Sequence, residues 1–184
     1  MCKQVPFGTT VPGKKNAAFV VITMKSTVYE NYDDPNVDKN QQVNLAVMVH
    51  RWDGCQGFIG GMVDQGESLR DAAMREMMEE INLDIVSADQ LEPLASHELD
   101  RLVVHAFHCD LGLRPTSFVR KLFADAVLAE HSIAEGVAIP VHLETYKWGK
   151  GLPRTLASNT LASAVKEELE LVCDKLKIKR PANG

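Results

Sequence analysis

Residues 61–83 read GMVDQGESLRDAAMREMMEEINL, and this stretch decides the fold class of the chain. Three of its glutamates, Glu76, Glu79 and Glu80, fall at the three- and four-residue spacings that bring side chains together on a helix. Like charges at such spacings repel by roughly a few tenths of a kcal/mol per pair. A helix of this kind therefore needs something nearby that offsets its negative charge.

A helical wheel at about 100° per residue brings the three glutamates together. Glu80 falls roughly 40° to one side of Glu76 and Glu79 roughly 60° to the other, so the three carboxylates should face a common point. Ala72 and Ala73 are predicted to flank this acidic arc and leave it open, and a separate arc is predicted to pack on the domain: Met74, Met77, Met78 and Ile81. Magnesium accepts a few carboxylates together with waters and phosphates. The alternative is a solvated acidic face.

The flanking residues favour the metal interpretation. Ser68 is a predicted N-cap, with Asp71 three residues on as an approximate capping box, and Asn82 can adopt the left-handed conformation that closes a helix. Arg75 stands beside the cluster, where it can orient Glu67. The glycine-rich entry GFIGGMVDQGE would let backbone carbonyls approach a metal closely.

Composition sets the outer limits. At 184 residues, with 45% hydrophobic residues, the chain is expected to form one domain spanning 1–184, with a solvated basic tail at about 175–184. The net charge of −5 argues against binding nucleic acid mainly through its backbone, but permits a grip on one nucleotide. Four scattered cysteines, no signal peptide and no membrane-length apolar run predict a soluble, cytoplasmic protein.

The remaining pattern predicts mixed strands and helices, and hence an α/β sandwich. Strands are expected at 16–24, 43–52, 55–63, 100–111 and 136–143, with a hairpin turn at Asp53-Gly54, and helices at 117–131 and 155–178. The last helix rests on the spacing of Leu161, Val165, Leu169 and Val172. The histidines form no metal site: His105 and His108 should point to opposite faces of a strand. His97 is expected in a polar loop, and the alternative is a position near the cleft.

The opening stretch resembles the Nudix box, G-x5-E-x7-R-E-U-x-E-E-x-G-U, where U is aliphatic. Gly61, Glu67 and the run Arg75 to Leu83 match it, with Asn82 in place of the second glycine. The resemblance implies an α/β/α Nudix fold with a mixed sheet. It also implies hydrolysis of a diphosphate linked to another moiety.

In that family, magnesium or manganese would be held by Glu76, Glu79 and Glu80 with the Gly60 carbonyl. Glu80 is the first choice to ligate metal and help activate water, and Glu67 would support the site by pairing with Arg75. Many relatives add a carboxylate from a distant loop. Glu135 is the candidate and Glu130 its rival, and a plain exposed glutamate is an equal alternative for Glu135.

Three outer segments resemble the branch that decaps small nucleolar RNA and hydrolyses inosine diphosphate: 51–64, 96–107 and 149–169. The resemblance implies substrates among nucleoside diphosphates, ADP-ribose-type molecules and capped RNA 5′ ends, often for a homodimer. Arg51 would reach a phosphate or sugar, and Phe58 and Met62 would line the cleft. The alternatives are a surface arginine for Arg51 and a core position for Phe58.

The base pocket departs from that branch at three positions. With Gly13 as anchor, Phe19 replaces a histidine, and Ala164 and Glu168 replace a serine and a glutamine. Phe19 could stack on a base without hydrogen-bonding it, whereas an ionised Glu168 accepts hydrogen bonds and would favour donor-rich guanine. The alternative for Glu168 is a solvated helix residue.

The leading hypothesis is thus a metal-dependent pyrophosphohydrolase acting on nucleotides or RNA 5′ ends. The alternative within this class is clearance of free nucleoside diphosphates or ADP-ribose. Outside it stand a non-catalytic nucleotide-binding module, which would be expected to have lost a box glutamate, and a purely structural acidic helix.

Overall fold

The computed structural model describes residues 2–27, 35, 38–129, 137–143, 151, 155–157 and 160–178. Within them one sheet has the strand order β1-β6-β7-β2-β3-β4, and β5 pairs with β2 and β8 with β3. The strands are β1 (Lys3–Val5), β2 (Lys15–Ser26), β3 (Val43–His50), β4 (Gln56–Gly57), β5 (Ile59–Met62), β6 (Glu92–Glu98), β7 (Leu102–Leu113) and β8 (Val137–His142). The helices are α1 (Leu69–Ile81), the 3₁₀ turn η1 (Ala88–Gln90), α2 (Thr116–Ala126) and α5 (Val165–Lys175).

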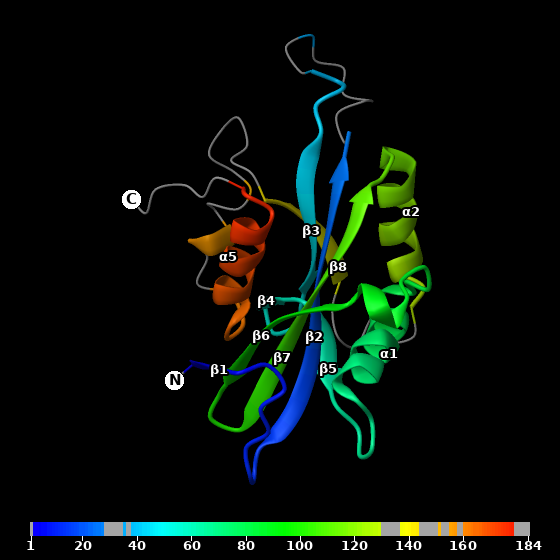
Figure 1. The fold of residues 1–184 in the computed structure, drawn as a ribbon. Helices are drawn as coiled ribbons and strands as arrows, with labels where there is room; N and C mark the ends of the chain where they lie inside the picture. Colours follow the sequence, from blue (N-terminus) through cyan, green and yellow to red (C-terminus); the bar gives the residue numbers. More distant parts are fainter. Residues whose placement is uncertain are drawn as a thin grey trace.

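Helices cover both faces of this sheet. Figure 1 shows α1 and α2 on one side and α5 on the other, so the predicted α/β/α sandwich is confirmed. The sheet is mixed because β2 runs parallel to β7 but antiparallel to β3 and β5. β2 is buried on both faces, which explains why its sequence is a continuous apolar run.

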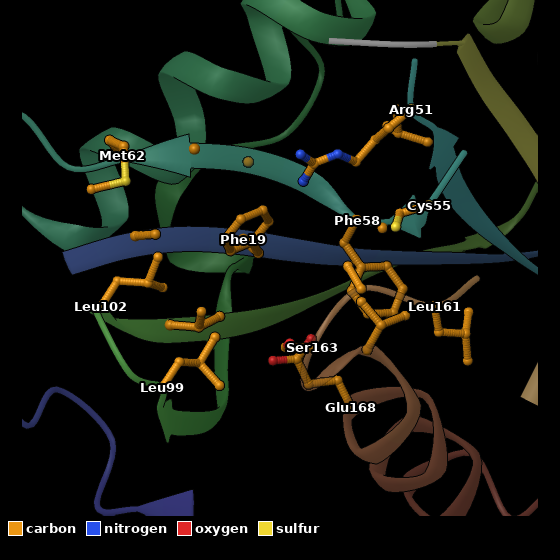
Figure 2. Close-up of a pocket in the computed structure, with 18 of the residues that line it drawn as sticks. Phe19, Arg51, Cys55, Phe58, Met62, Leu99, Leu102, Leu161, Ser163 and Glu168 are labelled. Carbon is orange, nitrogen blue, oxygen red and sulfur yellow. The ribbon is translucent and has the colours of Figure 1, made fainter. Parts of the chain in front are cut away.

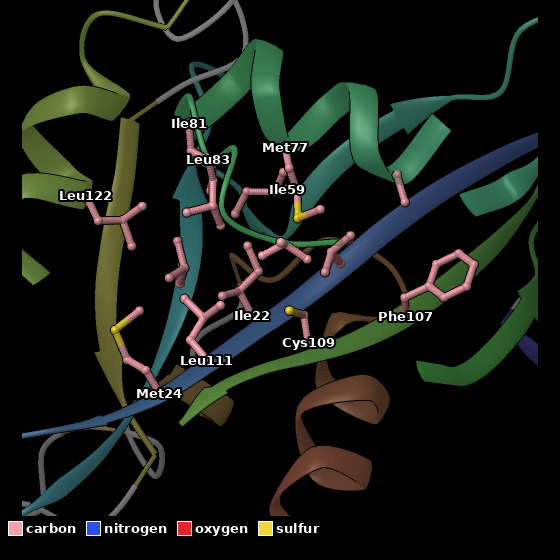
Figure 3. Packing of buried hydrophobic residues seen from close by; sticks show 14 of the residues in the cluster. Ile22, Met24, Ile59, Met77, Ile81, Leu83, Phe107, Cys109, Leu111 and Leu122 are labelled. Carbon is pink, nitrogen blue, oxygen red and sulfur yellow. The ribbon is translucent and has the colours of Figure 1, made fainter. Parts of the chain in front are cut away.

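Each face of the sheet has its own hydrophobic cluster. Ile22 of β2 packs with Met77 of α1 and Leu122 of α2, as Figure 3 shows. Its neighbour Val21 points to the opposite face and belongs with Leu169 of α5. The two-residue period of a strand therefore divides one apolar run between two cores.

The predicted hairpin is present, but its second arm divides. β4 pairs with the end of β3 across the turn, whereas β5 leaves β3 and pairs with β2. Gly60 of β5 lies opposite Phe19 with φ of +145°, and a Cβ there would collide with the carbonyl oxygen of Ala18. Only glycine allows the two backbones to come so close.

The terminal helix begins ten residues later than the periodicity predicts. Leu161 forms an isolated parallel bridge with Gln56, whose backbone N–H donates to the Thr160 carbonyl at 2.6 Å. Ala164 then adopts a left-handed conformation, φ 73°, directly before α5. A helix that began at residue 155 would lose the hydrogen bonds that this segment makes with β4. The prediction that Leu161 lies on the terminal helix is therefore wrong.

β6 and β1 were missed by the hydrophobic pattern, because β6 carries a proline and several polar residues and β1 spans only three residues. Among the strands that the structure describes, β8, whose proline predicts an edge or an end, pairs only with β3. Among the helices that the structure describes, none is both long and apolar enough to cross a membrane.

Candidate active site

The glutamate helix α1 has the predicted ends. The Ser68 hydroxyl accepts a hydrogen bond from the Asp71 backbone N–H at 3.1 Å, which confirms Ser68 as N-cap. The Asp71 carboxylate accepts from the Ser68 hydroxyl at 2.7 Å, so the reciprocal contact joins two side chains. Asn82 closes the helix at φ 53° and ψ 40°, as expected of a left-handed cap.

The buried face of α1 is rotated from the predicted one. Met78 is 42% exposed and so does not pack on the domain, whereas Ala72 and Ala73 are fully buried. Glu76 and Glu80 lie on the buried face, at 8% and 6% exposure. Two carboxylates thus sit where the helix meets β5, which is costly for charged groups unless they are partnered.

Arg75 supplies part of that partnership. Its Nε and Nη2 donate to the two Glu67 oxygens at 3.0 and 3.1 Å, which confirms the predicted pair. Its Nη1 donates to Glu76 at 2.8 Å and Glu79 at 3.0 Å, and Nη2 also donates to the Met62 carbonyl at 3.0 Å. The hydrogen bond from Arg75 lowers the pKa of Glu67, and the bond to Glu67 raises the pKa of Arg75.

The glycine loop lies against the carboxylates of Glu80 and Glu76. The Gly60 backbone N–H donates to a Glu80 oxygen at 2.9 Å, so Gly60 contacts the acidic face through its amide. The role of its carbonyl as a metal ligand stays a prediction. A Cβ at Gly61 would collide with a Glu76 carboxylate oxygen. These two glycines leave room for the carboxylates of α1 against β5.

The three carboxylates are adjacent but do not converge on a common point. Within the described residues no group of three His, Cys, Asp or Glu side chains is arranged as a metal site. Glu76 and Glu79 turn towards Arg75, and Glu80 turns towards the Gly60 amide. The prediction of convergence is therefore wrong for this arrangement, although a set of carboxylate oxygens beside a tight glycine loop suits a hard divalent cation. Glu135 and Glu130 lie outside the described residues.

A cavity of about 580 Å³ adjoins this helix, which is ample for a nucleotide-sized ligand. Glu80, Gly60 and Gly61 line it together with residues from β2, β7 and the start of α5. Figure 2 shows how Phe19, Arg51, Phe58, Met62 and Glu168 surround the same space. The structure therefore brings five of the six predicted substrate-binding residues to one cavity.

Ala164, the sixth, is not among the described residues that line the cavity. It is 3% exposed and has a left-handed backbone conformation, while its neighbours Ser163 and Val165 line the wall. The structure therefore does not place Ala164 on the cavity wall, and its role in substrate binding stays a prediction. The strand-edge bridge of Leu161 sets this turn, and a helical reading of the segment misses it.

The other lining residues differ in exposure. The side chain of Arg51 is 40% exposed and forms an ion pair with Asp53 at 3.2 Å. It also lines the cavity. Phe58 is 4% exposed, belongs to the core on the α5 side and also borders the cavity. Met62 is 39% exposed.

Glu168 is buried at 1% exposure, so the solvated-helix alternative is wrong. One of its oxygens faces Nδ1 of His97 at 3.4 Å. His97 lies in β6 at 2% exposure, not in a polar loop as expected. Burial raises the pKa of Glu168, and the neighbouring His97 partly opposes that rise.

Sequence reasoning missed the apolar wall of the cavity, which includes Leu99, Leu102 and Val104. The alternation of LVVHAF identified β7, but nothing in the pattern of β6 showed which cavity these residues border. Their placement follows from the β6–β7 pairing, in which His97 lies opposite Val104.

Comparisons with known proteins agree with this geometry. The NUDIX domain family matches residues 36–139, which is more than half of the chain. No curated protein sequence matches the chain in a direct comparison.

Among solved structures, a mutT/nudix family protein from Listeria innocua is similar at 16% identity and a TM-score of 0.55, covering 91% of this chain and 96% of its own. The pyrophosphohydrolase BsRppH from Bacillus subtilis gives 14% identity, a TM-score of 0.55, and coverage of 97% and 93%. The NUDIX domain of Shewanella oneidensis NrtR, in complex with ADP ribose, is similar at 13% identity and a TM-score of 0.53, and the match covers 90% of each chain.

These likenesses concern the fold. The family match covers the glutamate helix, the glycine loop and the strands β3 to β7, but not β2. The hydrolases of this family generally use divalent metal ions and act on nucleotide substrates. The chain belongs to the NUDIX domain family.

Proposed function

We propose that this protein hydrolyses a nucleoside diphosphate linked to another moiety, with nucleotides or RNA 5′ ends as substrates and magnesium or manganese as cofactor. The observation that carries the proposal is that one cavity contains both Glu80 with its glycine loop and the aromatic side chains Phe19 and Phe58. A diphosphate needs the carboxylates for its metal, and a base needs flat apolar surfaces.

Glu76, Glu79 and Glu80 would hold the metal, with Gly60 contributing from the loop and Glu135 as a further candidate ligand. The metal would neutralise the diphosphate and lower the pKa of a bound water. Arg75 positions Glu67, Glu76 and Glu79 through its hydrogen bonds. Arg51, at the cavity wall, is placed to contact a phosphate or sugar.

The alternative substrate class is free nucleoside diphosphates or ADP-ribose. The net charge of −5 favours small substrates over long RNA, and the NrtR domain with bound ADP ribose shares the fold. The resemblance of segments 51–64, 96–107 and 149–169 to the decapping branch favours RNA 5′ ends and a homodimer.

One panel tests these substrates. Purified protein with magnesium or manganese is given nucleoside diphosphates, ADP-ribose, dinucleotides and capped RNAs, alongside Glu80→Gln. We expect the variant to lose about 10²-fold or more of turnover while its circular dichroism is unchanged, because the ligand to the metal is removed and the shape is kept.

Asp84→Asn is the matched control, since it removes an exposed carboxylate just beyond the same helix. An unchanged rate in Glu80→Gln would contradict the proposal. Nucleotide binding without turnover of any substrate, with either metal, would favour the non-catalytic module instead.

A further inference from the structure

The segment that precedes β2 crosses the edge of the sheet and contacts both of its faces. β1 pairs with β6 along its three residues. Before β1, Cys2 borders a small hollow beside α5. After β1, the ring of Phe7 packs edge-on against Phe107, which belongs to the core under α1. Figure 1 shows this segment at the outer edge of the sheet, and we refer to residues 2–8 as the strap.

The strap also reaches the rim of the large cavity. A hollow of about 330 Å³ is lined by Cys2 together with Leu99, Leu102 and Ser163. The same Leu99, Leu102 and Ser163 line the cavity that contains Glu80. The two spaces therefore meet at these three residues, and Cys2 brings the strap to this place.

A chain of hydrogen bonds beneath the Phe7 ring holds the strap on the sheet. The Gly8 backbone N–H donates to the Ser96 hydroxyl oxygen at 3.2 Å, and that oxygen lies 2.7 Å from Nδ1 of His105. Nε2 of the same imidazole lies 3.2 Å from the side-chain oxygen of Asn16. The rings of Phe7 and His105 meet edge to face, with 6.0 Å between centroids. Both Ser96 and His105 are fully buried.

The neutral imidazole satisfies every atom of this chain. An amide oxygen only accepts, so Asn16 requires a proton on Nε2 of His105. Nδ1 then accepts from the Ser96 hydroxyl, whose oxygen accepts in turn from Gly8. A second proton, on Nδ1, would take away the acceptor that the Ser96 hydroxyl now has. In a fully buried site such a loss is costly.

The surroundings of the ring also disfavour a charged imidazole. Burial lowers the pKa of His105, and both of its nitrogens have uncharged partners. The charged groups on the elements packed around it are engaged elsewhere or exposed. Glu98 of β6 pairs with Lys14 at 2.9 Å, Arg70 of α1 lies over an aromatic ring, and Lys3 of the strap is exposed. A positive charge on His105 is therefore not compensated.

We propose that the strap is a pH-sensitive closure: the neutral imidazole of His105 holds it on the sheet, and protonation of His105 releases it. When the strap is open, water reaches the ring, which then takes up a proton near its ordinary pKa of about 6.5, whereas the closed strap keeps that pKa lower. The open form binds the proton more readily, so its population rises as pH falls below about 6.5. Release moves Cys2 away from the cavity rim. The inference needs neither nucleotide nor metal and stands apart from the proposed function.

Hydrogen exchange of the Gly8 amide measures the opening, because this N–H is freed when its bond to Ser96 breaks. We expect its protection factor, which is corrected for the intrinsic effect of pH, to fall about tenfold from about pH 7.5 to about pH 5.5. Amides in the centre of β2 should stay better protected than Gly8 throughout. In the same protein, the NMR titration of the His105 ring should have its midpoint below 6.5.

His105→Gln removes the titration and keeps a side chain that can donate to Asn16 and accept from Ser96. We expect the Gly8 protection factor of this variant to be the same at both pH values. His50→Gln, at the exposed end of β3, is the matched control and should keep the tenfold change of the parent protein.

Both measurements are made first on the parent protein, so the test does not depend on the folding of a variant. A His105 midpoint at or above 6.5, or a Gly8 amide protected as strongly as the centre of β2, would overturn the inference. The same holds for a tenfold change that persists in His105→Gln.

Discussion

Arg75 organises the acidic face of α1 at the scale of a single residue. Its planar guanidinium reaches Glu67, Glu76, Glu79 and the Met62 carbonyl at once. The five donors of a guanidinium make this possible, and an ammonium group cannot reproduce their fixed arrangement. The repulsion among neighbouring carboxylates is thereby offset within the protein before any metal is bound.

Arg75→Lys should therefore weaken metal use more than stability. A lysine keeps the charge but cannot hold three carboxylates, so we expect the magnesium concentration for half-maximal activity to rise about 10- to 100-fold. Titration of metal-depleted protein measures this, and thermal shift by magnesium gives a second reading. Arg120→Lys on α2 is the control, and an unchanged metal requirement in Arg75→Lys would contradict the role.

At the scale of elements, the contact between β5 and its two neighbours depends on consecutive glycines. A Cβ at Gly60 would meet the backbone of β2, at Ala18 and Phe19. One at Gly61 would meet only the flexible end of Glu76 on α1. Gly60 therefore allows the close approach of β5 to β2, and Gly61 leaves space for the Glu76 carboxylate.

Gly60→Ala and Gly61→Ala should consequently fail in different ways. We expect Gly60→Ala to lose on the order of 2 kcal/mol or more of unfolding free energy, since backbone must move and φ of +145° is strained for alanine. Gly61→Ala should keep a melting temperature near that of the parent and lose activity, because Glu76 is displaced. Urea unfolding and turnover measure both, and equal stability of the two variants would refute this division.

At the scale of the whole molecule, one cavity is lined by residues from helices on opposite faces of the sheet. α1 on one face supplies the carboxylates, and α5 on the other supplies Glu168, yet both reach one cavity. β2 and β5 lie between them and contribute Phe19, Gly60 and Met62.

Keeping Glu168 buried should cost stability in a pH-dependent way. Burial raises its pKa above the ordinary value of 4.5, so its contribution to stability is fully present below that value and is lost as pH rises through the folded pKa. The titratable groups that face it are His97, Glu167 and the Cys2 thiol.

Glu168→Gln removes this titration. We expect the melting temperature of Glu168→Gln, relative to that of the parent protein, to rise as pH rises from about 4.5 towards neutrality. The reason is that the parent protein then buries a charged carboxylate, whereas the variant buries a neutral amide. Melting curves across that range measure the difference. A difference that is constant with pH, or that falls as pH rises, would contradict a raised pKa.

Much of the fold was predictable because its signals are local. The caps of α1 at Ser68 and Asn82 depend on residues within one turn, and an uninterrupted apolar run predicted β2. The start of α5 was not predictable, because helical spacing from Leu161 competed with an edge bridge to Gln56 that lies far away in sequence. β6 was missed, and His97 was expected in a loop, because the polar residues of this segment are buried only after pairing with β7.

By itself, then, the sequence determined the family fold, the acidic helix with its glycine entry, and the pairing of Arg75 with Glu67, because spacing and capping act over a few residues. Only the tertiary structure decided that Gly60 packs against Phe19, that Glu76 and Glu80 face inward, and that Glu168 is buried against His97. Each of these depends on which strands pair and which helix covers them, and the free energy of those contacts comes from residues distant along the chain.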